Sequence, residues 1–101
     1  MKLLQHLDHV QMRDGSAFLG DVINPTFTLQ AHALGAVKIQ ADRIISITFH
    51  GPSTGPEDRV ILKDGGQLFG KTLDTVVEMD DDGLGRLKLQ TSEILAIQYT
   101  F

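Results

Sequence analysis

Apolar and polar residues alternate along most of this chain, in short runs that turn residues separate. In the first half, residues 10–13, 37–40 and 45–49 alternate in this way. A period of two is typical of a strand that buries one face. Asp14-Gly15 and Asn24-Pro25 lie between the runs and favour turns. Outside residues 1–8, which could form one helical turn, no stretch keeps helical spacing, so the pattern predicts an all-β protein.

The second half of the chain repeats the first. Residues 5–51 align with residues 55–101 at an offset of 50 without a gap, and eleven of these 47 positions are identical. Unrelated segments of this composition would share about three. The identical pairs are Asp8/Asp58, Val10/Val60, Asp14/Asp64, Gly15/Gly65, Gly20/Gly70, Leu34/Leu84, Gly35/Gly85, Lys38/Lys88, Gln40/Gln90, Ile44/Ile94 and Ile47/Ile97. A repeat at a fixed period predicts two units that fold alike.

Each unit is expected to contain about five strands. We divide the chain into a first repeat at 1–50 with a short N-terminal extension, a Gly/Pro linker at 51–58 and a second repeat at 59–101. A unit of this size is near the lower limit for folding alone, so the two copies should pack around a pseudo-twofold axis. The sequence predicts either two tandem five-stranded barrels or one fused β-sandwich of both copies. It leaves open whether the copies exchange strands.

Each unit resembles the Sm-like small β-barrel, the five-stranded SH3-type fold of RNA-binding ring proteins. An alternating apolar run, Asp-Gly and a further glycine make up the first Sm motif, and the second motif ends in spaced apolar residues. The matching residues are Val10–Gly15 with Gly20, Val60–Gly65 with Gly70, Ile39, Ile44 and Ile47, and Leu89, Ile94 and Ile97. The family's Arg-Gly is replaced by Gln40-Ala41 and Gln90-Thr91. The resemblance therefore implies the barrel fold without its RNA contacts.

Composition narrows the classes of function. The chain has 101 residues, no cysteine and a formal net charge of −4. The absence of cysteine excludes a disulfide framework and thiolate metal sites. The acidic balance argues against a nucleic-acid partner, because such domains usually carry a basic face. No apolar run could cross a membrane and no signal peptide is evident, so we expect a cytoplasmic protein.

One segment matches the phosphate-binding loop G-x-x-x-x-G-K-[ST], with Gly65, Gly70, Lys71 and Thr72 at its fixed positions. That chemistry requires a helix that begins after the lysine. The residues that follow favour a strand, and the first copy repeats both glycines without the lysine. We therefore expect the glycines to serve turns and strand packing, with no bound cofactor.

Metal sites are the next candidates. All four histidines, His6, His9, His32 and His50, lie in the first copy. On a helical turn His6 and His9 would share one face, with Asp8 as an oxygen ligand, whereas on a strand they would point apart. The acidic run 80–82 before Gly83 lacks the later glutamate of a calcium loop and favours a solvated turn. No metal residue is assigned, and whether His6 and His9 bind metal stays open.

Catalytic and nucleic-acid patterns are weak. No serine lies in a nucleophile elbow, and no carboxylate pair is marked for acid–base chemistry. The repeated cations Lys38/Lys88 and Arg13/Lys63 are expected to point outward, and the aromatics, Phe69 among them, to point inward. The sequence thus predicts a non-enzymatic interaction or scaffold module that self-associates as a homo-oligomer and contacts protein partners. The alternative is an Sm-like RNA-binding protein.

Overall fold

The computed structural model describes residues 7–32, 34–52, 55–81 and 83–99. It contains ten β-strands and two short 3₁₀ turns, which confirms the all-β prediction and five strands in each copy. The first copy contributes β1 (Asp8–Met12), β2 (Ala17–Val22), β3 (Thr26–Ala31), β4 (Gly35–Gln40), η1 (Ala41–Arg43) and β5 (Ile44–Thr48). The second copy contributes β6 (Asp58–Leu62), β7 (Gln67–Thr72), β8 (Val76–Asp81), β9 (Gly85–Gln90), η2 (Thr91–Glu93) and β10 (Ile94–Gln98).

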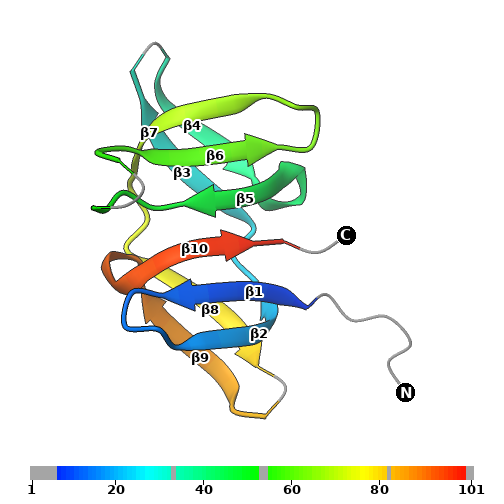
Figure 1. The fold of residues 1–101 in the computed structure, drawn as a ribbon. Coiled ribbons are helices and arrows are strands. Elements are labelled where there is room, and N and C mark those ends of the chain that lie inside the picture. The colour runs from blue at the N-terminus through cyan, green and yellow to red at the C-terminus, as the bar shows by residue number, and fades with distance from the viewer. Residues whose placement is uncertain (1–6, 33, 53–54, 82, 100–101) are drawn as a thin grey trace.

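All ten strands belong to one antiparallel sheet with the order β4-β3-β7-β6-β5-β10-β1-β2-β8-β9 (Figure 1). The pairing does not confirm two separate barrels, each built from one copy. Strand β2 pairs with β8 and β3 pairs with β7, so the copies exchange strands. We call β4-β3-β7-β6-β5 the upper half-sheet and β10-β1-β2-β8-β9 the lower half-sheet. Each half-sheet combines three strands of one copy with two of the other.

A pseudo-twofold axis passes between β5 and β10, at the middle of the sheet. Ile47 lies directly opposite its own counterpart Ile97. The backbone bonds obey the same symmetry, because the Phe49 N–H donates to the Leu95 carbonyl at 2.8 Å and the Tyr99 N–H donates to the Ile45 carbonyl at 2.9 Å. The 50-residue repeat is therefore also a structural repeat, as predicted.

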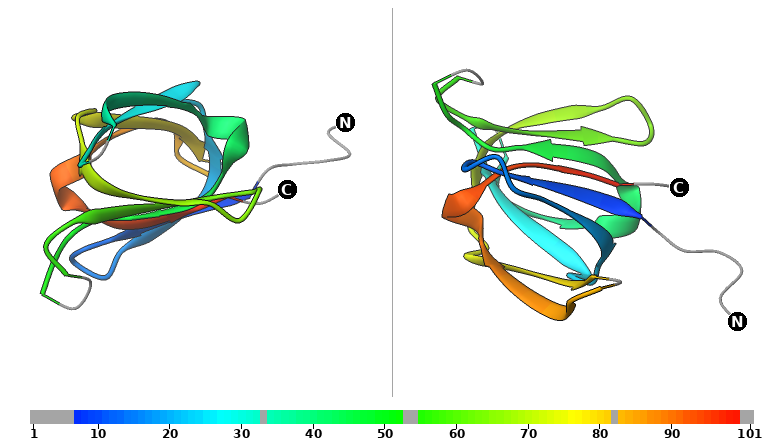
Figure 2. Two further views of the ribbon diagram at one scale, coloured as in Figure 1. Left: turned by 90° about the horizontal axis from the view of Figure 1, so that it is seen from above. Right: turned by 60° about the horizontal axis from the view of Figure 1, so that its bottom comes forward.

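The sheet curls so that its outer strands lie behind its middle strands (Figures 1 and 2). The curl encloses one hydrophobic core to which both copies contribute, and Phe27, Ile47, Val77 and Ile97 are almost completely buried in it. Burial of such a side chain contributes about 1.5–3 kcal/mol. Because neither copy encloses a core of its own, the two copies are expected to fold as one unit.

Two repeated glycines mark the places where the copies cross. Gly20 on β2 lies opposite Asp81 of β8, and a Cβ atom at Gly20 would lie 2.1 Å from the Asp80 carbonyl oxygen. Gly70 on β7 lies opposite Ala31 of β3, with the Gln30 carbonyl oxygen at the same 2.1 Å. Any side chain would collide with the exchanged strand, so both copies require glycine here.

In the described part of the chain, no helix has the length and apolar character needed to cross a bilayer.

Candidate functional site

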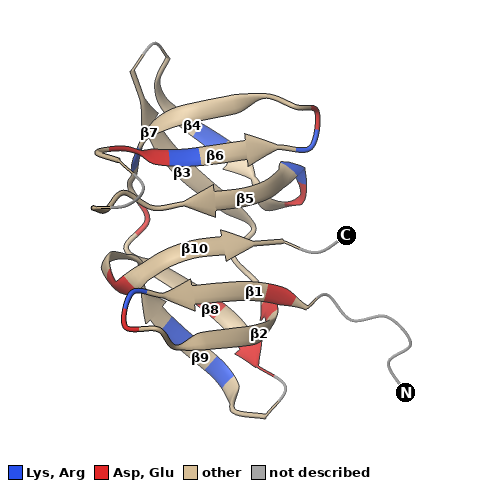
Figure 3. Cartoon of the chain, in the orientation of Figure 1, with Lys and Arg blue, Asp and Glu red and all other residues tan. Residues whose placement is uncertain are grey.

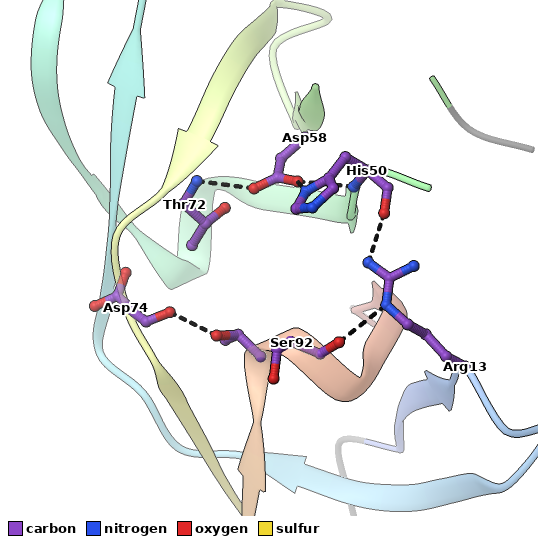
Figure 4. A network of polar contacts seen from close by, with 7 residues as sticks. Arg13, His50, Asp58, Thr72, Asp74 and Ser92 are labelled. Atoms are coloured by element: carbon purple, nitrogen blue, oxygen red, sulfur yellow. Dashed lines mark hydrogen bonds and ion pairs between the residues drawn. The ribbon is translucent and has the colours of Figure 1, made fainter. Parts of the chain in front are cut away.

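A buried carboxylate, Asp58, organises the polar site drawn in Figure 4. Its Oδ2 accepts the Thr72 N–H at 2.8 Å, and its Oδ1 accepts the His50 N–H at 2.8 Å. The His50 ring places Nδ1 2.8 Å from the same Oδ1. Because Asp58 begins β6, His50 follows β5 and Thr72 ends β7, one carboxylate fixes three segments of the upper half-sheet.

Hydrogen bonds favour the ionised form of the Asp58 carboxyl group despite its burial. Burial opposes ionisation of its carboxyl group, but the N–H groups of Thr72 and His50 and the His50 ring outweigh burial and hold the pKa of Asp58 below its usual value. Asp8, the counterpart in the first copy, is equally buried and accepts the Val22 N–H at 2.9 Å. The repeated aspartate therefore holds the end of β2 in one case and the end of β7 in the other.

An open cleft of about 340 Å³ lies beside Asp58. Its polar lining includes His50, Lys71, Asp74, Thr91 and Ser92. Asp74 Oδ2 accepts the Thr28 N–H at 2.7 Å, and the Thr91 hydroxyl donates to the Asp74 carbonyl at 2.8 Å. Segments of both copies thus line the cleft, and several of its polar groups form hydrogen bonds within the chain.

Arg13 crosses from the lower half-sheet to the rim of the cleft. Its Nε donates to the Ser92 carbonyl at 3.0 Å, and its Nη2 donates to the His50 carbonyl. Figure 4 shows the side chain bridging these two segments. Arg13 was predicted to point outward, and it is exposed, but its guanidinium also links β1 to η2 and to the end of β5.

The cleft differs from the equivalent region of the other copy. Thr72, Asp74 and Ser92 stand where the first copy has Val22, Asn24 and Asp42. The Thr72 hydroxyl is buried without a hydrogen-bond partner among the described residues. An unpaired buried hydroxyl costs about 1–3 kcal/mol. The valine in the first copy shows that this position of the fold does not need the hydroxyl.

The geometry of His50 and Asp58 is that of a carboxylate that orients an imidazole. In the described residues, no serine or threonine hydroxyl forms a hydrogen bond with this imidazole, and Ser92 contributes its carbonyl to Arg13. The contacts of His50 and Asp58 hold neighbouring segments of the chain in place. Neither residue was singled out for this role from the sequence, although the identity of Asp8 and Asp58 in the two copies was a usable signal.

His32 and His50 line one hollow but contact different carboxylates. His6 lies outside the described residues, so the pairing of His6 with His9 lies outside them too. His32 forms an ion pair with Glu57, and His50 binds Asp58. The Asp8 carboxylate is buried against the Val22 N–H. In the parts of the chain that the structure describes, no group of three or more potential metal ligands is present.

The two loop motifs lie in strands and in the turns next to them. Residues 67–72 of the phosphate-loop pattern form strand β7, and no helix follows Lys71, as predicted. In the acidic run, Asp81 Oδ1 accepts the Gly83 N–H at 2.8 Å and the Leu84 N–H at 2.9 Å, which forms a turn. Asp80 pairs with Arg86. The structure thus places the first motif in a strand and the second at a turn.

A second feature of the surface is a set of exposed apolar side chains. Four large side chains at two pairs of equivalent positions are exposed: Leu34 (64%) and Leu84 (66%), and Phe69 (47%) and Leu19 (52%). The prediction that Phe69 points inward is wrong, because Leu68 and Gly70 occupy the inner face of β7. Near Leu34 and Phe69, together with Ala31, His32 and Leu68, lies a hollow of about 410 Å³. The hairpins β3–β4 and β8–β9, which carry Leu34 and Leu84, end at the top and at the bottom of the molecule in Figure 1.

The backbone of β7 is also open beside this hollow. The ladder between β3 and β7 ends at Ala31 and Gly70, and beyond it residues 67–69 pair only with β6. The Leu62 N–H donates to the Gly66 carbonyl, so these two residues form a hydrogen-bonded pair at the end of the β6–β7 ladder. Hydrogen-bonded and non-hydrogen-bonded pairs alternate along an antiparallel ladder, so Arg59 and Phe69, three pairs further along, form a non-hydrogen-bonded pair. The N–H and C=O groups of Phe69 therefore point away from β6, toward the hollow.

Comparison of the chain with protein-family models, with curated proteins and with solved structures finds no match.

Proposed function

We propose that this protein is a non-enzymatic interaction module that acts through self-association and protein contacts. The observation that carries the proposal is the recurrence of exposed apolar side chains at equivalent positions of both copies. We call Leu34, Phe69 and Lys71 the upper end, and their equivalents Leu84, Leu19 and Asp21 the lower end. Clustered exposed apolar residues, rimmed by polar ones, are typical of protein-interaction surfaces.

The symmetry makes the module bivalent. Leu34 and Leu84 lie at the tips of the two outermost hairpins, so one chain can engage partners in two places. Their identity in both copies supports a role outside the core, because neither side chain is needed to fill it. Two weak sites on one rigid body give a higher avidity than either alone.

The strand exchange allows each half-sheet to be compared with one SH3/Sm-like unit. Each half-sheet contains one strand of each of the five kinds in the repeat. We propose that each half-sheet corresponds to one SH3/Sm-like unit whose first two strands come from the other copy. RNA binding is the weaker alternative, because the net charge of −4 and the absence of the Sm Arg-Gly both oppose it. The lack of cysteine fits a cytoplasmic protein.

Light scattering over a wide concentration range tests the proposed function. The wild-type chain should show a mass above the 11.1 kDa of one chain. The double variant Leu34→Ser/Leu84→Ser should shift the mass toward a single chain, because it removes the exposed apolar surface at both tips. Leu73→Ser is the control, since Leu73 is similarly exposed but outside both ends. A wild-type protein that stays a single chain throughout, or a double variant that assembles like wild type, contradicts the proposal.

A further inference from the structure

The two ends have equivalent positions in the fold but different charges. Lys71 follows the crossing glycine Gly70 on β7, and Asp21 follows Gly20 on β2, so the two charges occupy equivalent positions. Both side chains are exposed. The repeat therefore places a cation beside one apolar end and an anion beside the other.

The neighbours of these residues reinforce the difference. Asp21 lies directly opposite Asp80 on β8, whereas Lys71 lies opposite the neutral Gln30 on β3. Like charges placed directly opposite each other destabilise a sheet. Asp80 has a cation in Arg86, but in the described parts of the chain neither Asp21 nor Lys71 forms an ion pair.

Most of the neighbouring charges follow the same division, with Glu57 at the upper end and Arg86 at the lower end as exceptions. At the upper end Arg59 lies across from Phe69, and Glu57 is bound by His32. At the lower end His9 lies across from Leu19, and the acidic residues Asp21, Asp80 and Asp81 gather on two adjoining strands (Figure 3). The upper end is thus basic and the lower end acidic.

We propose that the occupant of each end is a second copy of this chain, bound head to tail, with the upper end of one copy against the lower end of the next. This inference rests on the proposed function and adds the identity and direction of the partner. A contact between like ends would oppose Lys71 to Lys71 or Asp21 to Asp21. A contact between unlike ends sets Lys71 against Asp21 and gives the Asp21–Asp80 pair a second cation. Because such a contact is heterologous, it builds rings or filaments.

Charge exchange at these two positions tests the proposal. Lys71→Asp places an aspartate at this position of both ends and Asp21→Lys places a lysine at both, so each single variant should lose assembly and approach the 11.1 kDa of one chain. An equimolar mixture of the two variants should recover assembly, because an aspartate of one variant then meets a lysine of the other. The double variant Asp21→Lys/Lys71→Asp should recover it alone. All four proteins are compared by light scattering at low and high salt, with melting curves to confirm folding.

The outcomes separate this inference from the proposed function. Wild-type assembly that weakens in high salt, is lost in both single variants and returns in the mixture supports the head-to-tail contact. The salt effect is expected because the screening length falls from about 10 Å at 0.1 M to about 3 Å at 1 M. Folded single variants that assemble like wild type overturn the head-to-tail contact but leave self-association intact. A wild-type protein that never assembles overturns both.

Discussion

The carboxylate of Asp58 joins three segments of the chain, the ends of β5 and β7 and the start of β6. It is 2% exposed, and it accepts hydrogen bonds that favour the charged form. A buried charge is tolerated only when it is satisfied in this way. The identity of Asp8 and Asp58 in both copies is therefore explained by the need to fasten the strand that crosses to the other copy.

Asp58→Asn should lower the free energy of unfolding by about 1.5–3 kcal/mol, the range for hydrogen bonds to charged groups. The pKa of Asp58 is depressed in the folded state, so its stabilisation is complete above the unfolded value of about 3.9 and is lost as the pH falls through the folded value. The difference between wild type and variant should accordingly shrink in acid. Urea denaturation at neutral and at acidic pH measures it.

Asp64→Asn serves as the matched control for Asp58→Asn. Asp64 also accepts a backbone N–H, from Gly66 at 2.8 Å, but its side chain is 60% exposed. Its replacement should cost less than about 1 kcal/mol. Equal decreases in the free energy of unfolding for the two variants, or a decrease for Asp58→Asn that does not depend on pH, would contradict the conclusion that the charged Asp58 carboxylate holds these segments together.

At the scale of elements, the crossing strands explain the second repeated feature, the glycines of β2 and β7. Gly70→Ala should lower the free energy of unfolding by about 3 kcal/mol, because its Cβ atom would lie 2.1 Å from the Gln30 carbonyl oxygen. Gly83→Ala is the control, since a Cβ atom there would make an ordinary contact at 3.6 Å with Asp81. Thermal melting of the two variants compares them. A Gly70→Ala protein as stable as Gly83→Ala would show that β3 does not approach β7 so closely.

The sequence predicted the elements and left their pairing open. Alternation at 10–13 and 37–40 identified β1 and β4, and the repeated Asp14-Gly15 identified the turn between β1 and β2, where the Ser16 N–H donates to Asp14 Oδ1. The exchange could not be predicted, because β2 would bury the same face against β3 as against β8. In the sequence, only Gly20 and Gly70 indicated where strands of the two copies meet, and a glycine in a strand has several explanations.

The candidate site was less predictable than the fold. His50 was noted only as one of four scattered histidines, and its carboxylate partner lies eight residues along the chain, beyond the Gly/Pro segment. No local pattern brings Arg13 to η2, because that contact spans 79 residues and depends on the strand order. The exposed apolar ends were also missed, since Phe69 reads as a core residue until the face of β7 is known.

At the scale of the whole molecule, duplication and exchange produce one core and two outward-facing ends. The ten-stranded sheet has only two outer strands, β4 and β9, and both belong to the hairpins that carry the exposed leucines. Lys38 and Lys88 are exposed on these strands, where charge discourages direct edge pairing. If the chain associates with itself as proposed, contact through the apolar ends is therefore expected rather than extension of the sheet.

A pair of engineered cysteines, in a chain that has no cysteine of its own, tests whether the two copies exchange strands. Asp21 on β2 lies opposite Asp80 on β8, whereas a barrel built from one copy would set Asp21 opposite Gln30, the equivalent residue of β3. Under mild oxidation and at high dilution, Asp21→Cys/Asp80→Cys should form an intramolecular disulfide, detected by intact mass and gel mobility, and Asp21→Cys/Gln30→Cys should stay reduced. A disulfide in the second variant and none in the first would show that each copy folds on itself.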